Sequence, residues 1–377
     1  MKRGITMNKT DLQEYRRKHV PVFNDNKMKL GVFGSNVSGG GTITFAERSF
    51  TPTYQHNVAI AQKADELEFE MLIPFGRWKS LGGKSEYNGE CMEVFTWATA
   101  MATQTKKIMV FATSHVPTVH PIVAAKQGAT IDHISNGRWG LNIVCGWYTD
   151  EMEMFGAPQM SHDDRYRYAN EWFHVVKRLW TEQHFDHAGE FFRIKDGYLL
   201  PKPIQQPHPV VINAGISPAG RDFSARAVDI NFISIDRIEN GQATVADIRR
   251  RAREYKRDIG VMSYLFVLCR DTEREAKQAY NYILEKGDWD AAYNIMRILG
   301  VESESFGSQI RDFAARFVAG WGGYPIVGSP EQVVDELLKL SNIGVEGAII
   351  LWHDYLPELT YFGENVLPLM RQAGLRM

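Results

Sequence analysis

The sequence predicts an α/β protein whose strands close into a (β/α)8 barrel of the TIM type. Its length of 377 residues matches such a barrel with insertions. Eight short apolar runs alternate with amphipathic helical stretches, which is the pattern of parallel strands joined by helices. An open doubly wound sheet is disfavoured, because "GVFGSNVSGGG" after the first run lacks the GxGxxG spacing of a dinucleotide-binding turn.

The individual elements follow from apolar periodicity and from the turn residues between them. The strand candidates are residues 29–35, 69–76, 108–114, 139–146, 209–215, 230–235, 264–270 and 347–353. Helix candidates with apolar residues near i, i+3 and i+4 are residues 54–68, 91–105, 122–135, 165–180 and 330–343. The stretch 191–209 is typical of a small hairpin followed by a proline-rich approach to the fifth strand.

The chain divides into a short arm and one domain. Residues 1–27 are expected to be a polar N-terminal arm, and residues 28–377 a single barrel domain, since no linker rich in Pro, Ser or Gly interrupts them. The segment from about 271 to 328 is long for one connection. Its helical stretches and the loop "FVAGWGGYPIVGSP" predict an insertion near the mouth of the barrel.

The charge balance limits which binding partners are expected, and the cysteine content indicates the compartment. The 43 basic and 45 acidic side chains give a net charge of -2, so we expect neither nucleic acid nor an anionic membrane as a partner. The N-terminal sequence has no apolar signal core, and no run is long enough to span a bilayer. Three widely spaced cysteines without a CxxC pair indicate a reducing compartment, and we expect a cytoplasmic protein.

Polar residues at the ends of the predicted strands are the first functional candidates, because barrel enzymes work at the carboxyl ends of their strands. Asn142 lies inside the apolar run "GLNIVCG", where a strand disfavours asparagine and a buried amide needs partners. Thr113 ends the neighbouring third strand, and Arg77 follows the second. Glu151 follows the fourth strand by a few residues.

Two predicted helix starts are candidates for binding an anion. Ser217 precedes a helix beginning near Pro218, and the free N–H groups at such a start attract phosphate. Arg165 and Tyr166 begin another helix in "SHDDRYRY", and arginine is well suited to grip phosphate. Among barrels, phosphate sites are common near the late strands.

The motifs of self-sufficient hydrolysis are absent from the sequence. There is no G-x-S-x-G elbow, P-loop or HExxH. His115, His120 and His162 do not show convergent ligand spacing, so no metal is expected, although His115 or His162 could carry protons near the mouth. A phosphate grip, amide and hydroxyl groups and many aromatic residues suit a bound cofactor that supplies the chemistry.

Several motifs together resemble the bacterial-luciferase-like flavin monooxygenases. The N-terminal half is similar to the pyrimidine (uracil ring-opening) monooxygenases, whereas "NVSGG" and much of residues 160–235 are similar to the dimethyl sulfone monooxygenases. Alkanesulfonate monooxygenases are more distant. The resemblance covers roughly residues 29–375. It rests on the order and spacing of "GGKSEY", "FATS", "AAKQGATIDHISNGRWGLNIVCGW", "HDDRYRYANEW" and "INAGISPAGRDFSA".

The resemblance implies a two-component enzyme that binds reduced FMN (FMNH2) and uses O2. A separate NAD(P)H-dependent flavin reductase would supply the reduced flavin, oxygen would add to it as a peroxide, and a homodimer or homotetramer is expected. Thr113 and Asn142 match positions that resemble an oxygen pocket beside the flavin N5. By the same motif matching, flavin contacts would fall on Arg77, Asn142, Glu151, Arg165, Tyr166 and Ser217.

Each of these residues also has a simpler interpretation. Asn142 could be a satisfied core amide, and Thr113 an ordinary strand residue. Ser217 could only cap a helix, and Arg165 could pair with a neighbouring aspartate on the surface. Arg77 and Glu151 could be ordinary charged residues in exposed loops.

The substrate is expected to be small and largely uncharged. Alkanesulfonate enzymes carry an arginine in the mobile region before their "VG" turn, but here no arginine lies between Arg316 and Val327. An anion would need a fixed cation there, so a sulfone or a neutral heterocycle such as a pyrimidine or cyclic amide fits better. Alternatives are a deazaflavin-type oxidoreductase, an alkanesulfonate-type enzyme, or a flavin-binding accessory protein without chemistry.

Overall fold

The computed structural model describes residues 8–157, 160–300 and 309–377, and within them eight parallel strands close into a barrel. The sheet runs β1-β2-β3-β4-β7-β8-β9-β11, and pairing of β11 with β1 completes the ring. All eight predicted strands are confirmed. Their bounds are β1 Lys29–Phe33, β2 Met71–Ile73, β3 Met109–His115, β4 Trp139–Val144, β7 Val210–Asn213, β8 Ile230–Ile233, β9 Gly260–Cys269 and β11 Gly347–Leu351.

Strand β9 is longer than its apolar pattern suggests, and the extra length closes the barrel. Gly260–Ser263 pairs with β8, Met262–Phe266 pairs with β11, and Leu265–Cys269 pairs with the added strand β10, Tyr324–Gly328. One continuous strand therefore joins the barrel to the inserted segment. The run "GVMS" at its start gives a weaker strand signal than "YLFVLC", which explains the late predicted boundary.

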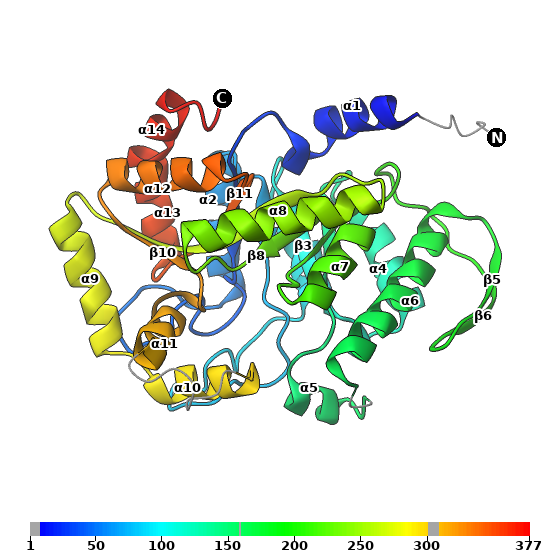
Figure 1. Ribbon diagram of the computed structural model, residues 1–377, viewed down its shortest axis with the longest axis horizontal. Helices are drawn as coiled ribbons and strands as arrows, with labels where there is room; N and C mark the ends of the chain where they lie inside the picture. Colours follow the sequence, from blue (N-terminus) through cyan, green and yellow to red (C-terminus); the bar gives the residue numbers. More distant parts are fainter. Residues whose placement is uncertain (1–7, 158–159, 301–308) are drawn as a thin grey trace.

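Helices surround the barrel and cover its outer face (Figure 1). Several begin at a capping side chain: Thr53, Ser161 and Ser217 each accept a backbone N–H at the start of α2, α6 and α7. The covering helices are α2 Tyr54–Glu66, α3 Val94–Gln104, α4 Pro121–Ile134, α6 His162–Thr181, α7 Pro218–Ala227, α8 Ile238–Glu254, α12 Pro330–Asn342, α13 Tyr355–Asn365 and α14 Leu367–Gln372.

Strand alternation divides the core into two layers. On β3, Met109 and Phe111 belong to the cluster inside the barrel, whereas Val110 and Ala112 pack outward with the helices. Gly140 on β4 is needed inside, because a Cβ there would lie 2.2 Å from the Phe111 ring. The interior of the barrel is therefore filled below the site, and a ligand can enter only at an end.

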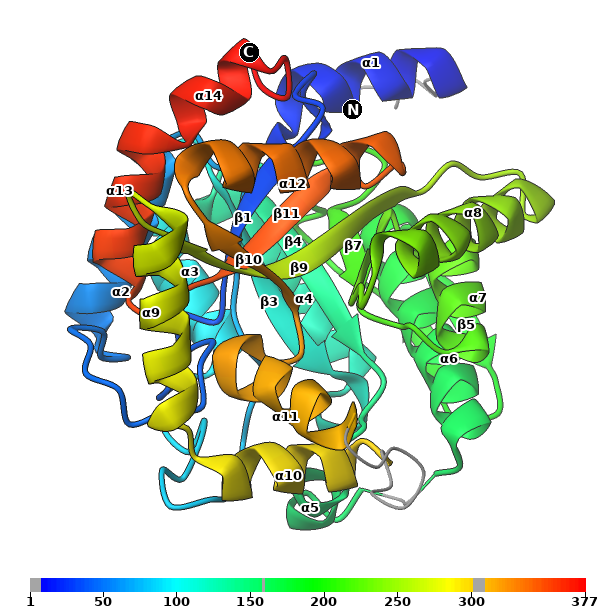
Figure 2. The same cartoon turned by 60° about the vertical axis from the view of Figure 1, so that its left-hand side comes forward.

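The amino-terminal end of the barrel is closed by both ends of the chain. Helix α1, Lys9–His19, the 3-10 turn Pro21–Phe23 and helix α14 all lie at the top of Figures 1 and 2. Arg16 pairs with Asp229 at 2.8 Å, and Arg376 pairs with buried Glu70 at 2.8 Å. The first seven residues of the expected arm lie outside the described residues.

The segment that follows β9 packs over the opposite, carboxyl end of the barrel (Figure 2). It holds α9 Glu273–Glu285, α10 Trp289–Ile298 and α11 Gln309–Gly320, and a third hydrophobic cluster joins it to the barrel mouth. Residues 301–308 of the expected insertion lie outside the described residues. At the same end lies the short helix α5, Thr149–Met154, in line with its position after β4.

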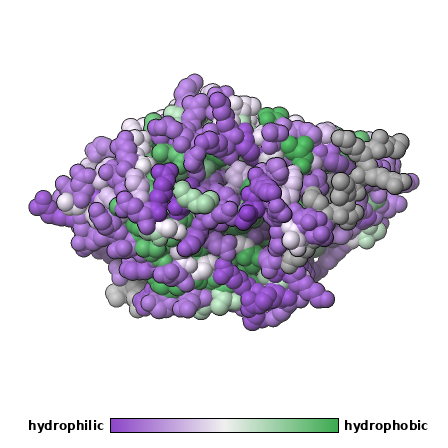
Figure 3. All heavy atoms as spheres, turned by 90° about the horizontal axis from the view of Figure 1, so that it is seen from above, coloured by the Kyte–Doolittle hydropathy of each residue, from purple (hydrophilic) through white to green (hydrophobic). Residues whose placement is uncertain are grey.

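The hairpin expected in residues 191–209 forms with an earlier partner strand. Strand β5, Phe185–Ala188, pairs antiparallel with β6, Arg193–Gly197, at one side of the molecule (Figure 1). The face bearing α1 and α14 is largely hydrophilic, with hydrophobic side chains in small patches (Figure 3). No helix of the described residues is long and apolar enough to cross a membrane.

Candidate active site

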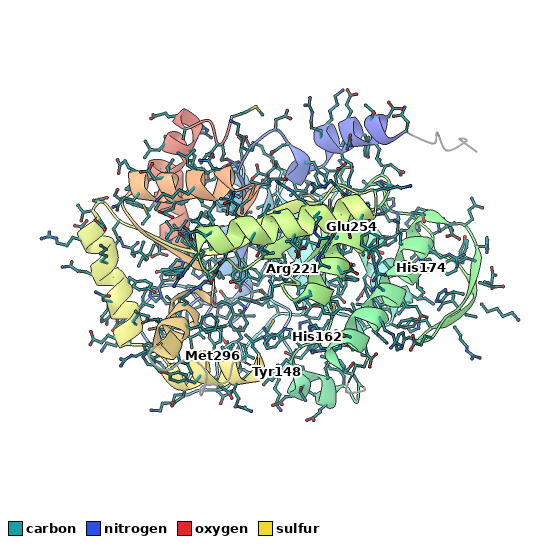
Figure 4. The ribbon with its side chains drawn as sticks, viewed as in Figure 1. Tyr148, His162, His174, Arg221, Glu254 and Met296 are labelled. Atoms are coloured by element: carbon teal, nitrogen blue, oxygen red, sulfur yellow. The ribbon has the colours of Figure 1, made fainter. Side chains whose placement is uncertain are left out.

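A cavity of about 490 Å³ lies at the carboxyl ends of the strands, under the inserted segment. This volume is within the usual range for cofactor and substrate pockets. In Figure 4 His162, Tyr148 and Met296 lie at this lower end of the molecule. Six of the seven predicted site residues line the cavity: Arg77, Thr113, Asn142, Arg165, Tyr166 and Ser217.

Asn142 and Thr113 face each other across paired strands at the cavity wall. They are register partners on β4 and β3, and Asn142 is only 2% exposed. Its Nδ2 donates to Thr113 Oγ1 at 3.1 Å, and that hydroxyl donates to the carbonyl of Pro74 at 2.6 Å. Because the hydroxyl's one hydrogen is used on Pro74, the amide must turn its nitrogen to Thr113. Asn142 Oδ1 is left without a partner among the described residues.

The predicted anion-binding residues gather where α6 and α7 begin. Arg165 Nη1 donates to the carbonyl of Gly146 at 2.7 Å, so this arginine does not form the surface pair with aspartate that the simpler interpretation suggested. Asp164 pairs with Arg167. Ser217 accepts the N–H of Gly220 at 3.1 Å and so caps α7. Burial raises the pKa of Tyr166 to about 12, although Ser217 and Arg165 act in the opposite direction. Its hydroxyl therefore remains a proton donor.

Two glycines allow these elements to approach closely. A Cβ on Gly220 would lie 2.6 Å from the Tyr166 hydroxyl oxygen and 2.8 Å from the Cα of Gly215. A Cβ on Gly215 would lie 2.7 Å from the Cα of Gly220. Glycine is thus required at both positions by contact with backbone. The result is a recess beside the start of α7, where backbone N–H groups and the helix dipole favour an anion.

Arg77 and Glu151 are buried rather than exposed, contrary to the expectation from the sequence. The Arg77 guanidinium lies over the rings of Trp147 and Trp321, at 5.1 and 5.7 Å from their centroids. Glu151 is 0% exposed and accepts the backbone N–H of Trp78 at 2.7 Å. Their charges are tolerated inside because they face each other: Arg77 Nη1 lies 3.6 Å from Glu151 Oε1.

Glu151 lies behind the wall of the cavity and contacts His115, which does line it. His115 Nδ1 is 3.0 Å from Glu151 Oε2, although neither atom has a hydrogen bond of good geometry among the described residues. His162 also lines the cavity but is half exposed and pairs with Asp163. Three or more metal-binding side chains gather nowhere in the part of the chain that the structure describes.

Comparison with known proteins identifies the family. The family model described as luciferase-like monooxygenase matches residues 28–347. The chain belongs to the luciferase-like monooxygenase family. It is 31% identical to an FMNH2-dependent dimethylsulfone monooxygenase of Pseudomonas putida, over 92% of this chain and 96% of that protein. It is also 31% identical to the pyrimidine monooxygenase RutA of Escherichia coli O150:H5 (strain SE15), over 91% of this chain and 92% of that protein.

The barrel of this luciferase-like protein is also the barrel of solved relatives. The crystal structure of a long-chain alkane monooxygenase (LadA) matches with a TM-score of 0.84 and 22% identity, covering 94% of this chain and 93% of that chain. The family and the barrel predicted from the sequence are therefore confirmed.

The polar groups of this luciferase-like site suit a flavin nucleotide. Asn142 Oδ1 is a buried acceptor without a partner, and Arg77 Nε and Nη1 are buried donors without one, in the part of the chain that the structure describes. Buried polar groups are normally paired, so polar groups of a bound flavin or of its substrate account for them. The recess at α7 suits its phosphate, and aromatic walls suit its ring system.

Some cavity residues escaped the sequence argument. Ser234 directly follows β8, where its position alone could have marked it, whereas Tyr264 lies in the middle of β9. Phe317 was not singled out, although the insertion that carries it was expected near the mouth; Trp321, in the same segment, was expected among the aromatic walls. His115 was considered, but its carboxylate partner is distant in sequence and only the fold brings it near.

Proposed function

We propose that this luciferase-like protein uses reduced FMN and O2 to insert one oxygen atom into a small uncharged organic molecule. The substrate class is a sulfone, or a pyrimidine or other cyclic amide, as in the names of its two relatives. The overall reaction combines substrate, O2 and FMNH2 into oxygenated substrate, FMN and water. The observation that carries the proposal is the unpartnered Asn142 Oδ1 beside Thr113, in a cavity that also reaches the anion recess.

The recess at α6 and α7 holds the phosphate in this proposal. Arg165 supplies a fixed positive charge, Tyr166 a protonated hydroxyl, and the start of α7 behind Ser217 its free N–H. These groups are positioned before the ligand arrives, because Arg165 is held by the Gly146 carbonyl and Ser217 by the Gly220 N–H. Such preorganisation reduces the entropy lost on binding.

Asn142 and Thr113 act at the reacting end. Bound reduced flavin supplies the two electrons that activate O2. Asn142 Oδ1 accepts a hydrogen bond from a ligand N–H, and its Nδ2 is held by Thr113, so the amide cannot turn. Neither side chain has a proton that titrates near neutral pH, and the buried walls exclude water from the oxygen chemistry.

The reduced flavin comes from a separate NAD(P)H-dependent flavin reductase, which acts as a transient partner. This follows from the FMNH2 dependence in the name of the Pseudomonas putida relative. The protein works in the cytoplasm as a homodimer or homotetramer. Gel filtration with light scattering, with and without reductase, measures both associations.

The alternatives have less support. A deazaflavin-type enzyme transfers hydride and has no need of O2, whereas the named relatives of this chain are monooxygenases. A flavin-binding accessory protein has no need of an Asn142–Thr113 pair beside an open cavity. An alkanesulfonate-type enzyme requires a cavity that accepts an anion, whereas the Arg77 guanidinium in this cavity already faces the carboxylate of Glu151.

The proposal is tested with purified protein, a flavin reductase, NADH and FMN. A panel of dimethyl sulfone, methanesulfonate, uracil and other cyclic amides is incubated in air and under strict anaerobiosis, and products are quantified by mass spectrometry. We expect a product from a neutral compound only with both O2 and reduced FMN. Turnover without oxygen, or no binding of FMN or FMNH2 in a fluorescence titration, contradicts the proposal.

A further inference from the structure

Arg77 has donor groups that the protein does not use. Its side chain is 3% exposed, and its Nε and Nη1 have no hydrogen-bond partner within the described residues. A guanidinium carries five N–H donors, and leaving them unpaired in a buried site destabilises the fold. Arg77 also lines the cavity, so its free donors are available to a ligand there.

Glu151 supplies the counter-charge for Arg77. Its Oε1 lies 3.6 Å from Arg77 Nη1, and its Oε2 lies 3.0 Å from His115 Nδ1. Burial alone would raise the pKa of Glu151, but His115, Arg77 and the N–H of Trp78 together hold it below its usual range. The carboxylate is therefore charged, and it offsets the positive charge of the Arg77 guanidinium.

The walls around the guanidinium are aromatic. Trp147 and Trp321 flank it, and Phe75 meets Trp321 edge to face at 5.4 Å between ring centroids. Trp321 has φ of 56°, the left-handed conformation with which α11 ends, since the N–H of Gly322 donates to the Arg316 carbonyl at 2.9 Å. The end of α11 therefore fixes the position of this wall. Arg316, also in the insertion, is turned away, since its Nη2 donates to the carbonyls of Ile235 and Gly322.

We propose that Arg77 binds an acceptor oxygen of the substrate, and that Glu151 balances its charge so that the cavity prefers an uncharged substrate to an anion of the same shape. The inference rests on the proposed function and adds a residue basis for its substrate class. A sulfone or amide oxygen can take the free N–H groups without bringing a net charge. An anion would lose its hydration beside an arginine whose positive charge Glu151 already offsets. Arg77 thus serves the substrate rather than the flavin.

The test compares two ligands of nearly equal shape, dimethyl sulfone and methanesulfonate, which differ in charge. Their dissociation constants are measured by calorimetry or ligand-observed NMR on protein loaded with oxidised FMN at pH 8, so that no turnover is involved. We expect the wild type to prefer dimethyl sulfone at least tenfold. If neither ligand binds, or if methanesulfonate binds as well as dimethyl sulfone, the inference fails.

Glu151→Gln removes the negative charge but keeps an oxygen that can accept the Trp78 N–H. The positive charge of Arg77 then has no counter-charge on Glu151, and we expect the preference for dimethyl sulfone to fall at least tenfold or to reverse. If Glu151 has only a structural role, the variant binds both ligands more weakly to the same extent. The ratio of the two dissociation constants then stays unchanged, and this result would overturn the inference. Asp150→Asn is the matched control, because Asp150 is 51% exposed and pairs with Lys79 on the surface. Its ratio should equal that of the wild type.

Arg77→Met distinguishes a substrate residue from a flavin residue. We expect the affinity for dimethyl sulfone to fall at least tenfold while the dissociation constant of FMN stays within about twofold. A large loss of FMN affinity with unchanged sulfone binding would show that Arg77 binds the flavin, and it would overturn the inference. Failure of the proposed function is distinguished from failure of this inference by other results: FMN does not bind to the wild type, or oxidation proceeds without O2.

Discussion

Arg165 should grip the flavin phosphate, and this can be tested by removing either the side chain or the phosphate. In the structure Arg165 lies in the first turn of α6, with one N–H fixed on the Gly146 carbonyl and the rest of the guanidinium at the cavity. We expect Arg165→Ala to bind FMN more weakly and riboflavin, which has no phosphate, as the wild type does.

The expected magnitude follows from the number of charged contacts. A hydrogen bond to a charged group contributes about 1.5–3 kcal/mol, and 1.4 kcal/mol corresponds to a tenfold change in affinity. Loss of one such contact therefore weakens FMN binding roughly 10- to 150-fold. The variant also loses the 2.7 Å bond to Gly146, which should lower the free energy of unfolding by about 1 kcal/mol.

The assay is flavin fluorescence quenching with FMN and riboflavin, on the wild type, Arg165→Ala and Arg167→Ala. Arg167 is the matched control, because it lies on the same helix but is 56% exposed and pairs with Asp164 and Glu190. The interaction energy from the two ligands and two proteins separates phosphate contact from general damage. If Arg165→Ala weakens FMN and riboflavin equally, or leaves FMN unchanged, the phosphate assignment is refuted.

Three further predictions follow from the same contacts. Asn142→Ala should keep FMN affinity within about threefold but release hydrogen peroxide in place of product, and coupled product near the wild-type level would refute its role. Gly220→Ala should place a Cβ against Tyr166 and Gly215 and lower the affinity for FMN at least tenfold in the quenching assay. Unchanged affinity would show that the recess can adjust to the added Cβ. Burial lowers the pKa of His208 to about 4, so the unfolded state binds more protons as pH falls from about 6.5. In urea unfolding, this one residue should therefore remove about 2 kcal/mol of stability between pH 8 and pH 5. His208→Gln should flatten that dependence, and an equally steep loss would contradict the cause.

Much of the barrel was predictable because each strand has its own apolar run, and the two faces of a barrel strand are both buried. Asn142 was conspicuous for the same reason: a polar side chain in such a run needs a specific partner. Ser217 and Arg165 were also found, since helix starts are visible in sequence and their chemistry suits an anion. Thr113 is different, because threonine is ordinary in any strand, and only the register with Asn142 makes it part of a pair.

The charged part of the site could not be predicted in the same way. Arg77 and Glu151 lie 74 positions apart in loops, and loop charges are usually exposed. Their burial depends on Trp147 and Trp321, and Trp321 comes from the segment after β9, whose path over the mouth has no signal in local periodicity. Arg77 was named as a flavin contact, and the search of the insertion for a cation therefore did not consider it.

Incorporation of oxygen from labelled O2 tests the central claim most directly. The purified protein, with a flavin reductase, NADH and FMN, is supplied with ¹⁸O2 and the neutral substrate that gives product in the panel. We expect one ¹⁸O atom in each product molecule and the second in water. Product without the label, or product formed at the same rate under argon, would contradict an oxygen-inserting, reduced-flavin mechanism.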